Sequence, residues 1–242
     1  MQVSRYFINS AKISALKIAL VSDVHDRDFG AVQSSLSEED PDIIALAGDI
    51  TNKRMSGNSA AEKVFRSCAE IAPSFFCPGN HEYAFTASDR KACEEAGVCF
   101  LDDEFVSREG VFIGGLRSGC RGEKCRRSSV SPEPRTEWLT AFDRQNGFKI
   151  LLSHHPEYYT RYIRHLDIDL ILSGHAHGGQ IRLFNRGLFS PNQGFFPEYT
   201  KGVYDGRLVV GTGLSNTAGI IPRFNNPAEL VMIKITGSRD RK

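Results

Sequence analysis

The amino-acid sequence predicts a layered α/β fold with a pair of mixed β-sheets, and three observations support this class. Six short apolar runs are continuous rather than alternating, which is typical of strands buried on both faces. Helix-like segments lie between several of these runs, as expected of βα units. Toward the C-terminus this alternation gives way to a hairpin pattern, which indicates that antiparallel strands contribute to the sheets.

Each predicted strand ends in a polar cluster, and the strands cover residues 16–21, 42–47, 74–77, 110–115, 148–153 and 169–173. The helices between them are predicted over residues 30–39, 59–71, 87–96 and 132–145. The last of these helices has a start signal and a stop signal, since Ser131 precedes Pro132 and Gly147 follows the last turn. Asp205-Gly206 between two apolar runs predicts a hairpin, and "ELVMIKI" near the C-terminus predicts a closing strand.

The composition limits the class of protein. The 242 residues, 40% of them hydrophobic, predict one domain over residues 1–242 with a core that needs no disulfide to fold. A formal net charge of +1 excludes a global field that attracts nucleic acid or membrane. The six cysteines form no C-x-x-C pair, so buried, reduced thiols are expected. We see no apolar run long enough for a signal peptide or a membrane span, and therefore expect a cytoplasmic chain without stable membrane insertion, with peripheral association left open.

Five polar motifs follow the ends of predicted strands: "SDVH" (22–25), "AGDI" (47–50), "PGNHEY" (78–83), "LSHHP" (152–156) and "SGHAH" (173–177). The carboxyl ends of strands in α/β sheets converge on one edge, where ligands bind. We therefore expect the following eight side chains to meet in space: Asp23, His25, Asp49, Asn80, His81, His154, His175 and His177.

Each motif taken singly is a weak signal. A lone histidine at a strand end is more often a hydrogen-bonded surface or core residue than a ligand. Asp49 after Gly48 is compatible with a helix cap, and Asn80 after Gly79 with a simple turn. Five of the seven histidines are among these eight side chains, with Asp and Asn beside them, and this favours a common site instead.

The residue types indicate which metal this site would bind. Imidazole nitrogens with carboxylates and one neutral amide suit Mn, Fe, Zn or Co, and of these we favour Mn. Asp-x-His and His-x-His would place two side chains on the same side of an extended segment. Each pair could then bind one ion or supply ligands to two, while Asp49 could bridge two divalent ions.

Two metals about 4 Å apart convert a bound water to hydroxide near neutral pH and hold phosphoryl oxygens for in-line displacement. In such a site Asn80 would be a neutral metal ligand that leaves the centre positively charged toward phosphate. His81 would face the substrate, where it stabilises the transferring phosphoryl group or protonates the leaving alkoxide. The expected activity is therefore metal-dependent hydrolysis of a phosphate ester.

The order D-x-H, G-D, G-N-H-E, H-x-P and G-H-x-H, from about residue 16 to the C-terminus, resembles the calcineurin-like metallophosphoesterase superfamily. The resemblance implies a four-layer αββα sandwich with two mixed β-sheets flanked by helices. It implies a first metal held by Asp23, His25 and His177, with Asp49 bridging, and a second held by Asn80, His154 and His175. It also implies that His81 is the catalytic histidine, with Asn80 beside it, and that His155 supports its neighbours by packing or hydrogen bonding.

The segments "GHAHGGQIRL" and "RFNNP" are similar to a bacterial branch of membrane- or wall-associated phosphodiesterases and UDP-diacylglucosamine pyrophosphate hydrolases. This similarity favours a small phosphodiester or pyrophosphate substrate, linked to a nucleotide, a sugar or a lipid. A nuclease remains a weaker alternative because the net charge is near zero. A catalytically silent scaffold with the same fold is the alternative from another class, although all eight key side chains are present. The sequence is silent on oligomeric state.

Two further segments have open interpretations. The basic segment 117–135 could be a solvated loop or a loop that binds an anionic substrate near the metals. Phe195 and Phe196 could form a lip that contacts lipid or a base, or could anchor a buried loop.

Overall fold

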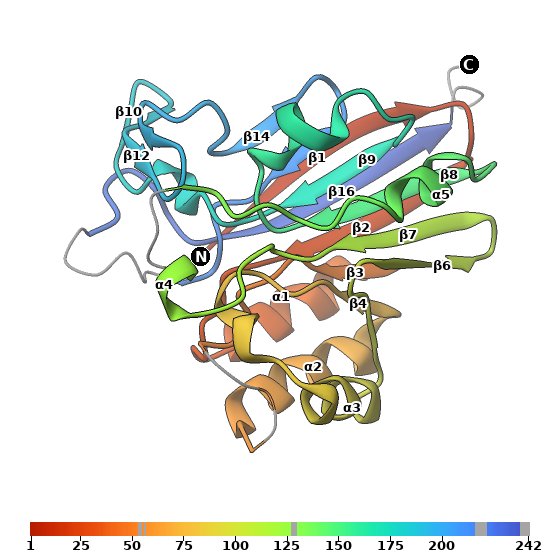
Figure 1. Cartoon of the computed structure of the whole chain (residues 1–242), viewed down its shortest axis with the longest axis horizontal. Coiled ribbons are helices and arrows are strands. Elements are labelled where there is room, and N and C mark those ends of the chain that lie inside the picture. Colours follow the sequence, from red (N-terminus) through yellow and green to blue (C-terminus); the bar gives the residue numbers. More distant parts are fainter. Residues whose placement is uncertain (53–54, 56, 127–129, 216–221, 238–242) are drawn as a thin grey trace.

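Two six-stranded mixed β-sheets form the centre of the molecule (Figure 1). The computed structural model describes residues 1–52, 55, 57–126, 130–215 and 222–237. The strands of the first sheet are, in spatial order, β1 (Gln2–Ser10), β16 (Glu229–Gly237), β2 (Ala15–Val21), β3 (Ile43–Leu46), β4 (Ser74–Phe76) and β5 (Val98–Phe100). Neighbouring strands are parallel except β16 and β2, which are antiparallel.

The second sheet contains, in spatial order, β14 (Gly202–Tyr204), β15 (Leu208–Val210), β9 (Leu170–Ser173), β8 (Phe148–Ser153), β7 (Val111–Leu116) and β6 (Glu104–Arg108). Its four central strands are parallel, and an antiparallel partner closes each edge. Two small hairpins stand apart from both sheets: β10 (Arg182–Leu183) with β11 (Arg186–Gly187), and β12 (Phe189–Ser190) with β13 (Gly194–Phe195).

Four helices lie on the outer faces of the sheets: α1 (Gly30–Glu39), α2 (Ser59–Ile71), α3 (Ala87–Glu95) and α5 (Leu139–Asp143). The short helix α4 (Glu123–Arg126) lies in the loop after β7 (Figure 1). Three single turns, η1 (His81–Ala84), η2 (Tyr159–Ile163) and η3 (His177–Gly179), complete the described elements. Among the described residues, no helix combines the length and the apolarity that a membrane crossing requires.

Three apolar clusters show how the layers stack. Ile18 and Leu20 of β2 share one cluster with Ile150 of β8, so the two sheets pack face to face. Ala19 and Val21, on the other face of β2, pack toward the helices α1 and α2. A third cluster joins the outer face of the second sheet to α5 and η2. The order helix, sheet, sheet, helix confirms the four-layer αββα fold, and it explains why the central strands are apolar on both faces.

The structure confirms most of the predicted elements. All six predicted strands are present with ends that differ by one residue at most, as are the helices α1, α2 and α3, the hairpin around Asp205 and the closing strand β16. All six cysteines are free, and four of them are buried. The sequence analysis missed β1, whose nine residues pair with the far end of the chain at β16.

The predicted helix over residues 132–145 is wrong, because only α5 (Leu139–Asp143) is helical there. Pro134 disfavours the helical conformation for Glu133, so two prolines two residues apart extend the chain instead of starting a helix. A residue outside this segment holds it in place, because the hydroxyl of Tyr158 donates a hydrogen bond to the carbonyl of Pro132 at 2.5 Å.

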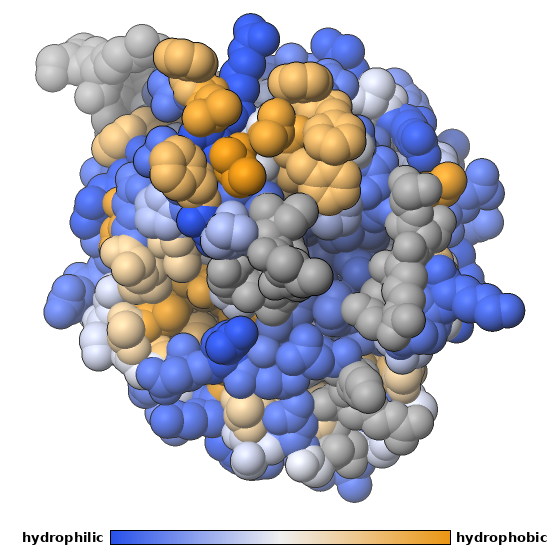
Figure 2. Space-filling view, turned by 90° about the vertical axis from the view of Figure 1, so that its left-hand side faces the viewer, coloured by the Kyte–Doolittle hydropathy of each residue, from blue (hydrophilic) through white to orange (hydrophobic). Residues whose placement is uncertain are grey.

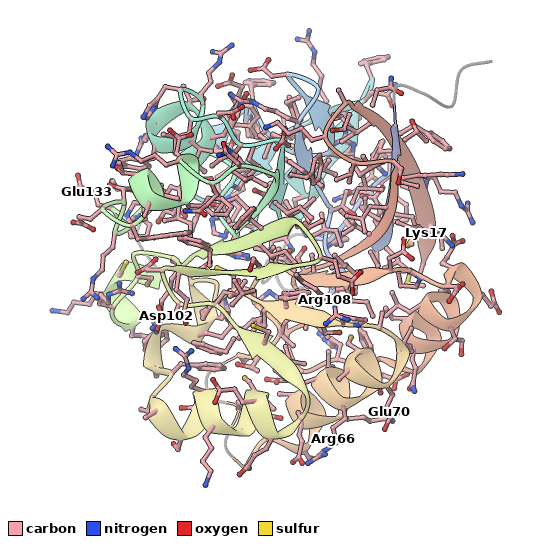
Figure 3. The ribbon with its side chains drawn as sticks, turned by 90° about the vertical axis from the view of Figure 1, so that its right-hand side faces the viewer. Lys17, Arg66, Glu70, Asp102, Arg108 and Glu133 are labelled. Atoms are coloured by element: carbon pink, nitrogen blue, oxygen red, sulfur yellow. The ribbon has the colours of Figure 1, made fainter. Side chains whose placement is uncertain are left out.

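The two ends of the sandwich differ in surface character. Figure 2 shows the end at which β10–β13 lie, where apolar side chains gather on the upper part of the surface. Figure 3 shows the opposite end, where the labelled Lys17 and Arg108 lie. The polar motifs follow the carboxyl ends of β2, β3, β4, β8 and β9, and so belong to the end seen in Figure 2.

Candidate metal centre

The five polar motifs meet where the two sheets present the carboxyl ends of their parallel strands. Seven of the eight predicted side chains belong to residues at most 7% exposed, and His81 is partly exposed. They include three groups whose potential ligand atoms lie within 4.8 Å of one another: Asp23 with His25 and His177, Asp49 with His154 and His175, and His25 with Asp49 and His81. The predicted convergence is therefore present, with Asp49 and His25 each belonging to two groups.

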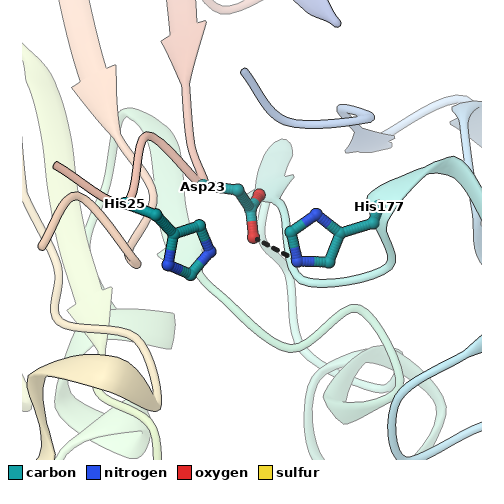
Figure 4. A group of neighbouring side chains, drawn as sticks. All are labelled: Asp23, His25 and His177. Carbon is teal, nitrogen blue, oxygen red and sulfur yellow. Dashed lines mark ion pairs between the residues drawn. The ribbon is translucent and has the colours of Figure 1, made fainter. Parts of the chain in front are cut away.

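The first group lies between β2 and the turn η3 (Figure 4). His177 Nε2 is 3.6 Å from Asp23 Oδ1, and the ring of His25 stacks on that of His177 with centroids 5.7 Å apart. His25 Nδ1 lies 3.2 Å from the side-chain oxygen of Asn52, so this nitrogen carries the proton. His25 Nε2 is then a buried acceptor without a hydrogen-bond partner among the described residues. A divalent cation between these side chains would satisfy it.

The second group brings three acceptors to one point. His154 Nδ1 is 2.8 Å from the carbonyl of Ala47 and donates to it. Its Nε2 atom lies 3.2 Å from Asp49 Oδ2 and 3.1 Å from Asn80 Oδ1. Three acceptors this close require a positive charge among them, either a metal ion or a proton. In the metal-free chain the proton fills this role: burial lowers the pKa of His154, but the Asp49 charge more than reverses this and raises it to about 10.

His175 and His177, the two histidines of the motif "SGHAH", lie in surroundings that favour the neutral form of imidazole. Burial lowers the pKa of His175 to about 3, helped by the positive charge of neighbouring His155. Burial likewise lowers the pKa of His177 to about 4, against the opposing effect of Asp23. Neutral imidazole is the form that binds a metal ion, so this environment favours ligation over protonation.

Asp49 stands at the centre of the site. Its Oδ2 atom lies 3.2 Å from His154 Nε2, 3.8 Å from His25 Nε2 and 4.0 Å from His81 Nε2. Its Oδ1 atom accepts the backbone N–H of His81 at 2.8 Å. The side chain of His81 is 18% exposed, whereas that of His154 is fully buried. This opening toward solvent fits the prediction that His81 faces the substrate.

The backbone of the site differs from the prediction that Asp-x-His and His-x-His are extended. Five residues have a positive φ in the left-handed region: Asp23 (53°), His25 (52°), Asp49 (54°), His175 (65°) and His177 (44°). Such backbone is uncommon for residues other than glycine and concentrates at functional sites. The reason is that the strands end before the motifs and the chain then curls over the sheet edge. As a result His175 and His177 point into different groups.

Glu82 is a buried residue to which the sequence analysis gave no role. Its carboxylate accepts three backbone N–H groups, from Asp49 at 2.9 Å, Thr51 at 3.0 Å and Gly79 at 2.8 Å. These bonds tie the loop of Asp49 to the loop of Asn80. Burial raises the pKa of Glu82 to about 8, the Asp49 charge adds to the rise, and the N–H donors oppose it. A cation beside Asp49 would offset the repulsion. The only sequence signal was its place in "GNHEY".

Other missed residues orient the histidines from outside. Asn192, in the turn between β12 and β13, lies 2.7 Å from His175 Nε2 through its side-chain oxygen. The ring of His155 packs at a tilt of 55° against that of His175, with centroids 4.2 Å apart, and its Nδ1 atom is 3.1 Å from Glu157 Oε1. Burial alone would raise the pKa of Glu157, but the hydrogen bond with His155 lowers it to about 2. The buried position of His155 agrees with the supporting role expected for it.

The basic segment lies beside the site in its described part. The backbone N–H of Ser118 donates to the carbonyl of Pro78, and the hydroxyl of Tyr83 donates to Glu123. Arg117 is half-buried and pairs with Asp102 at 2.7 Å, so its charge is already neutralised. Arg127 and the side chain of Arg126 lie outside the described residues.

The comparisons with known proteins agree with this site. Residues 16–179 match the model of the Metallophos family, the calcineurin-like phosphoesterases. The chain therefore belongs to this family, which confirms the resemblance seen in the motifs. Membership supports a site for two divalent ions at the histidine and aspartate groups.

Three relatives indicate the range of the family around this chain. An uncharacterised metallophosphoesterase of Helicobacter pylori strain 26695 is 26% identical over 91% of this chain and 60% of its own length. Phosphodiesterase YaeI of Escherichia coli K12 is 29% identical over 69% of this chain and 62% of YaeI. An uncharacterised metallophosphoesterase of Aquifex aeolicus is 27% identical over 98% of this chain and 92% of its own length. The chain thus spans only 60% of the length of the Helicobacter pylori relatives it matches.

Proposed function

We propose that this chain hydrolyses phosphate esters with two divalent cations and that its substrates are diesters or pyrophosphates. One observation carries the proposal. His154 Nε2 lies 3.2 Å from Asp49 Oδ2 and 3.1 Å from Asn80 Oδ1, an arrangement of acceptors that a positive charge would stabilise. Family membership supports the same reaction class.

The donor set fits the two cations. We assign Asp23, His25 and His177 to the first, Asn80, His154 and His175 to the second, and Asp49 to both. When bound, the cations would supply an activated water molecule and positive charge for the phosphoryl oxygens. Manganese is our choice among the metals that suit imidazole and carboxylate ligands, and iron, zinc and cobalt are the alternatives.

His81 is the catalytic residue that we place toward the substrate. Its backbone N–H is held by Asp49 Oδ1, so the ring position is fixed relative to the metal groups. Its side chain is 18% exposed, compared with 9% for His177, and from there it can donate a proton to the leaving alkoxide or a hydrogen bond to the phosphoryl group. Asn80 contributes an uncharged oxygen, which leaves the centre attractive to an anion.

The preference for diesters rests on two supports. The Escherichia coli relative carries the name phosphodiesterase. The described part of the basic segment adds Arg121 and Lys124, both exposed, beside the loop of Asn80. The positive side chains of Arg121 and Lys124 could bind the second substituent of a diester or a second phosphate. An Arg121→Ala, Lys124→Ala double variant with unchanged KM for a diester would refute this role.

The test combines metal analysis with two chromogenic esters. Wild type with added Mn²⁺ should bind two metals per chain and hydrolyse bis-p-nitrophenyl phosphate faster than p-nitrophenyl phosphate. Asn80→Ala and His81→Ala should lose this activity, and Asn80→Ala should also lose metal. His165→Ala is the matched control, because His165 is exposed and outside the site. Protein that binds no metal and remains inert with every cation tried would replace this proposal by the scaffold alternative.

A further inference from the structure

Exposed apolar side chains concentrate at one end of the molecule. Nine large hydrophobic residues are exposed among the part of the chain that the structure describes. Five of them form what we call the aromatic lip: Leu183 (48% exposed), Phe184 (99%), Phe195 (73%), Phe196 (78%) and Phe224 (55%). Figure 2 shows apolar side chains gathered over β10–β13 on this face. A cluster of this kind on a soluble domain marks an interaction surface.

The lip is one continuous surface because its segments are hydrogen-bonded to each other. Arg182 N–H donates to the carbonyl of Phe224 at 3.0 Å, which joins β10 to the segment near the C-terminus. Phe196 N–H donates to the carbonyl of Leu188 at 2.9 Å, and Leu188 N–H donates to that of Ile181 at 2.9 Å. An apolar cavity of about 170 Å³ lies between residues 179–181 and the β12–β13 hairpin, where Phe189 and Phe195 line it. The hairpins thus hold the aromatic rings outward on an ordered base.

The charges around the lip have one sign. Residues 181–196 and 222–226 contain Arg182, Arg186 and Arg223 and no acidic residue. Arg186 is exposed at the β10–β11 hairpin, beside Phe184. Arg182 donates to backbone carbonyls and a threonine hydroxyl, and no carboxylate in the described part of the chain forms an ion pair with it. The first acid along the chain is Glu198, which is hydrogen-bonded to Tyr199.

We propose that the aromatic lip docks peripherally on a bilayer surface containing anionic lipid. Aromatic rings flanked by arginines match the boundary of such a bilayer, which offers apolar acyl chains below a layer of negative headgroups. A second copy of the chain fits less well. A two-fold contact through the lip would place the same patch on itself, and the segments of the lip offer no acidic residue to pair with the arginines of the other copy.

Docking in this way would bring the metal centre to the membrane surface. Asn192, in the turn of the β12–β13 hairpin, lies 2.7 Å from His175 Nε2, so the lip and the site share one structural element. Esters carried by lipids would then reach the site without leaving the bilayer boundary. The docking itself depends only on the surface and stands apart from the proposed function.

Vesicle co-sedimentation tests the proposal. Wild-type protein should sediment with phosphatidylcholine vesicles that contain phosphatidylglycerol, more strongly than with pure phosphatidylcholine, and less at high salt. A Phe184→Ala, Phe196→Ala double variant should bind about tenfold more weakly, because binding scales with the apolar area inserted. Phe7→Ala is the matched control: Phe7 is 70% exposed but belongs to β1, outside the lip. It should bind like wild type.

Two charge-reversal variants complete the experiment. Arg186→Glu should abolish the preference for phosphatidylglycerol, whereas Arg108→Glu, at the opposite end of the molecule (Figure 3), should preserve it. Thermal unfolding midpoints equal to that of wild type establish that each variant is folded. Absence of vesicle binding by wild type, or binding unchanged in the double variant, overturns the proposal. A dimer in light scattering that the double variant loses, without vesicle binding, would assign the lip to a second copy instead.

Discussion

Replacing Glu82 by glutamine tests whether this buried carboxylate holds the metal-binding loops together. Glu82 is 0% exposed, and its two oxygens accept N–H groups from three residues of two loops. Glutamine keeps the size of the side chain but has only one acceptor oxygen. If this oxygen takes the position that serves Asp49 and Gly79, the new amide group faces the N–H of Thr51, and two donors meet.

The expected cost follows from the hydrogen bonds lost. Leaving one buried donor unsatisfied costs about 1–3 kcal/mol, and the opposed donors add to this. We therefore expect Glu82→Gln to lower the free energy of unfolding by about 2–4 kcal/mol. Glu82→Ala would orphan all three donors at about 3–9 kcal/mol, a large part of the total stability of a typical domain. The glutamine variant is thus the informative one.

Urea unfolding at about pH 9, above the pKa of about 8 for Glu82, followed by circular dichroism with chelator present, measures this loss for the ionised carboxylate without a contribution from bound metal. Glu62→Gln is the control, because that side chain is 49% exposed and pairs with Arg66 across one helical turn. Its unfolding midpoint should stay close to that of wild type. An unchanged midpoint for Glu82→Gln would refute the assignment of the three hydrogen bonds. Loss of metal without loss of stability would also contradict the reasoning.

Three further predictions concern other parts of the chain. Burial raises the pKa of Asp103 from 3.8 to about 6, so the folded state binds this proton more tightly than the unfolded state does. The free energy of unfolding of wild type should therefore fall as the pH rises through this range. Asp103→Asn should remove that loss, so in urea titrations the variant should be more stable than wild type at pH 7 but not at pH 4. Gly48 has φ +83°, and a Cβ there would lie 2.7 Å from His154 Nδ1. Gly48→Ala should therefore lower both the thermal unfolding midpoint and the metal content. A variant with full metal content would contradict this. Lys149 is buried and donates to two backbone carbonyls and to Asp167, so Lys149→Met should cost about 2–3 kcal/mol in urea unfolding while metal content stays unchanged.

Much of the site was predictable because it follows from strand ends. The apolar runs located β2, β3, β8 and β9, and parallel strands of one sheet present their carboxyl ends together. The polar residues directly after these strands were therefore expected to meet, as Asp23, Asp49, His154 and His175 do. This inference needed only the order of strands and motifs.

Residues that support the ligands gave no comparable signal. Asn192 follows β12 by two positions and contacts His175 through a hairpin of two-residue strands, a length that leaves no periodicity in the sequence. Glu82 looks like a surface acid beside a turn, and only the backbone N–H groups that surround it explain its burial. Contacts between distant segments decide both positions.

The sequence by itself determined the α/β class, the central strands and the identity of the polar residues at their ends. These features depend on local patterns, namely continuous apolar runs and the residues that end them. The tertiary structure alone decided three others: the pairing of β1 with β16, the left-handed backbone that sends His175 and His177 to different groups, and the exposure of the aromatic lip. Each of these arises from contacts between residues far apart in the chain or from dihedral angles imposed by packing, and neither leaves a period that a sequence can show.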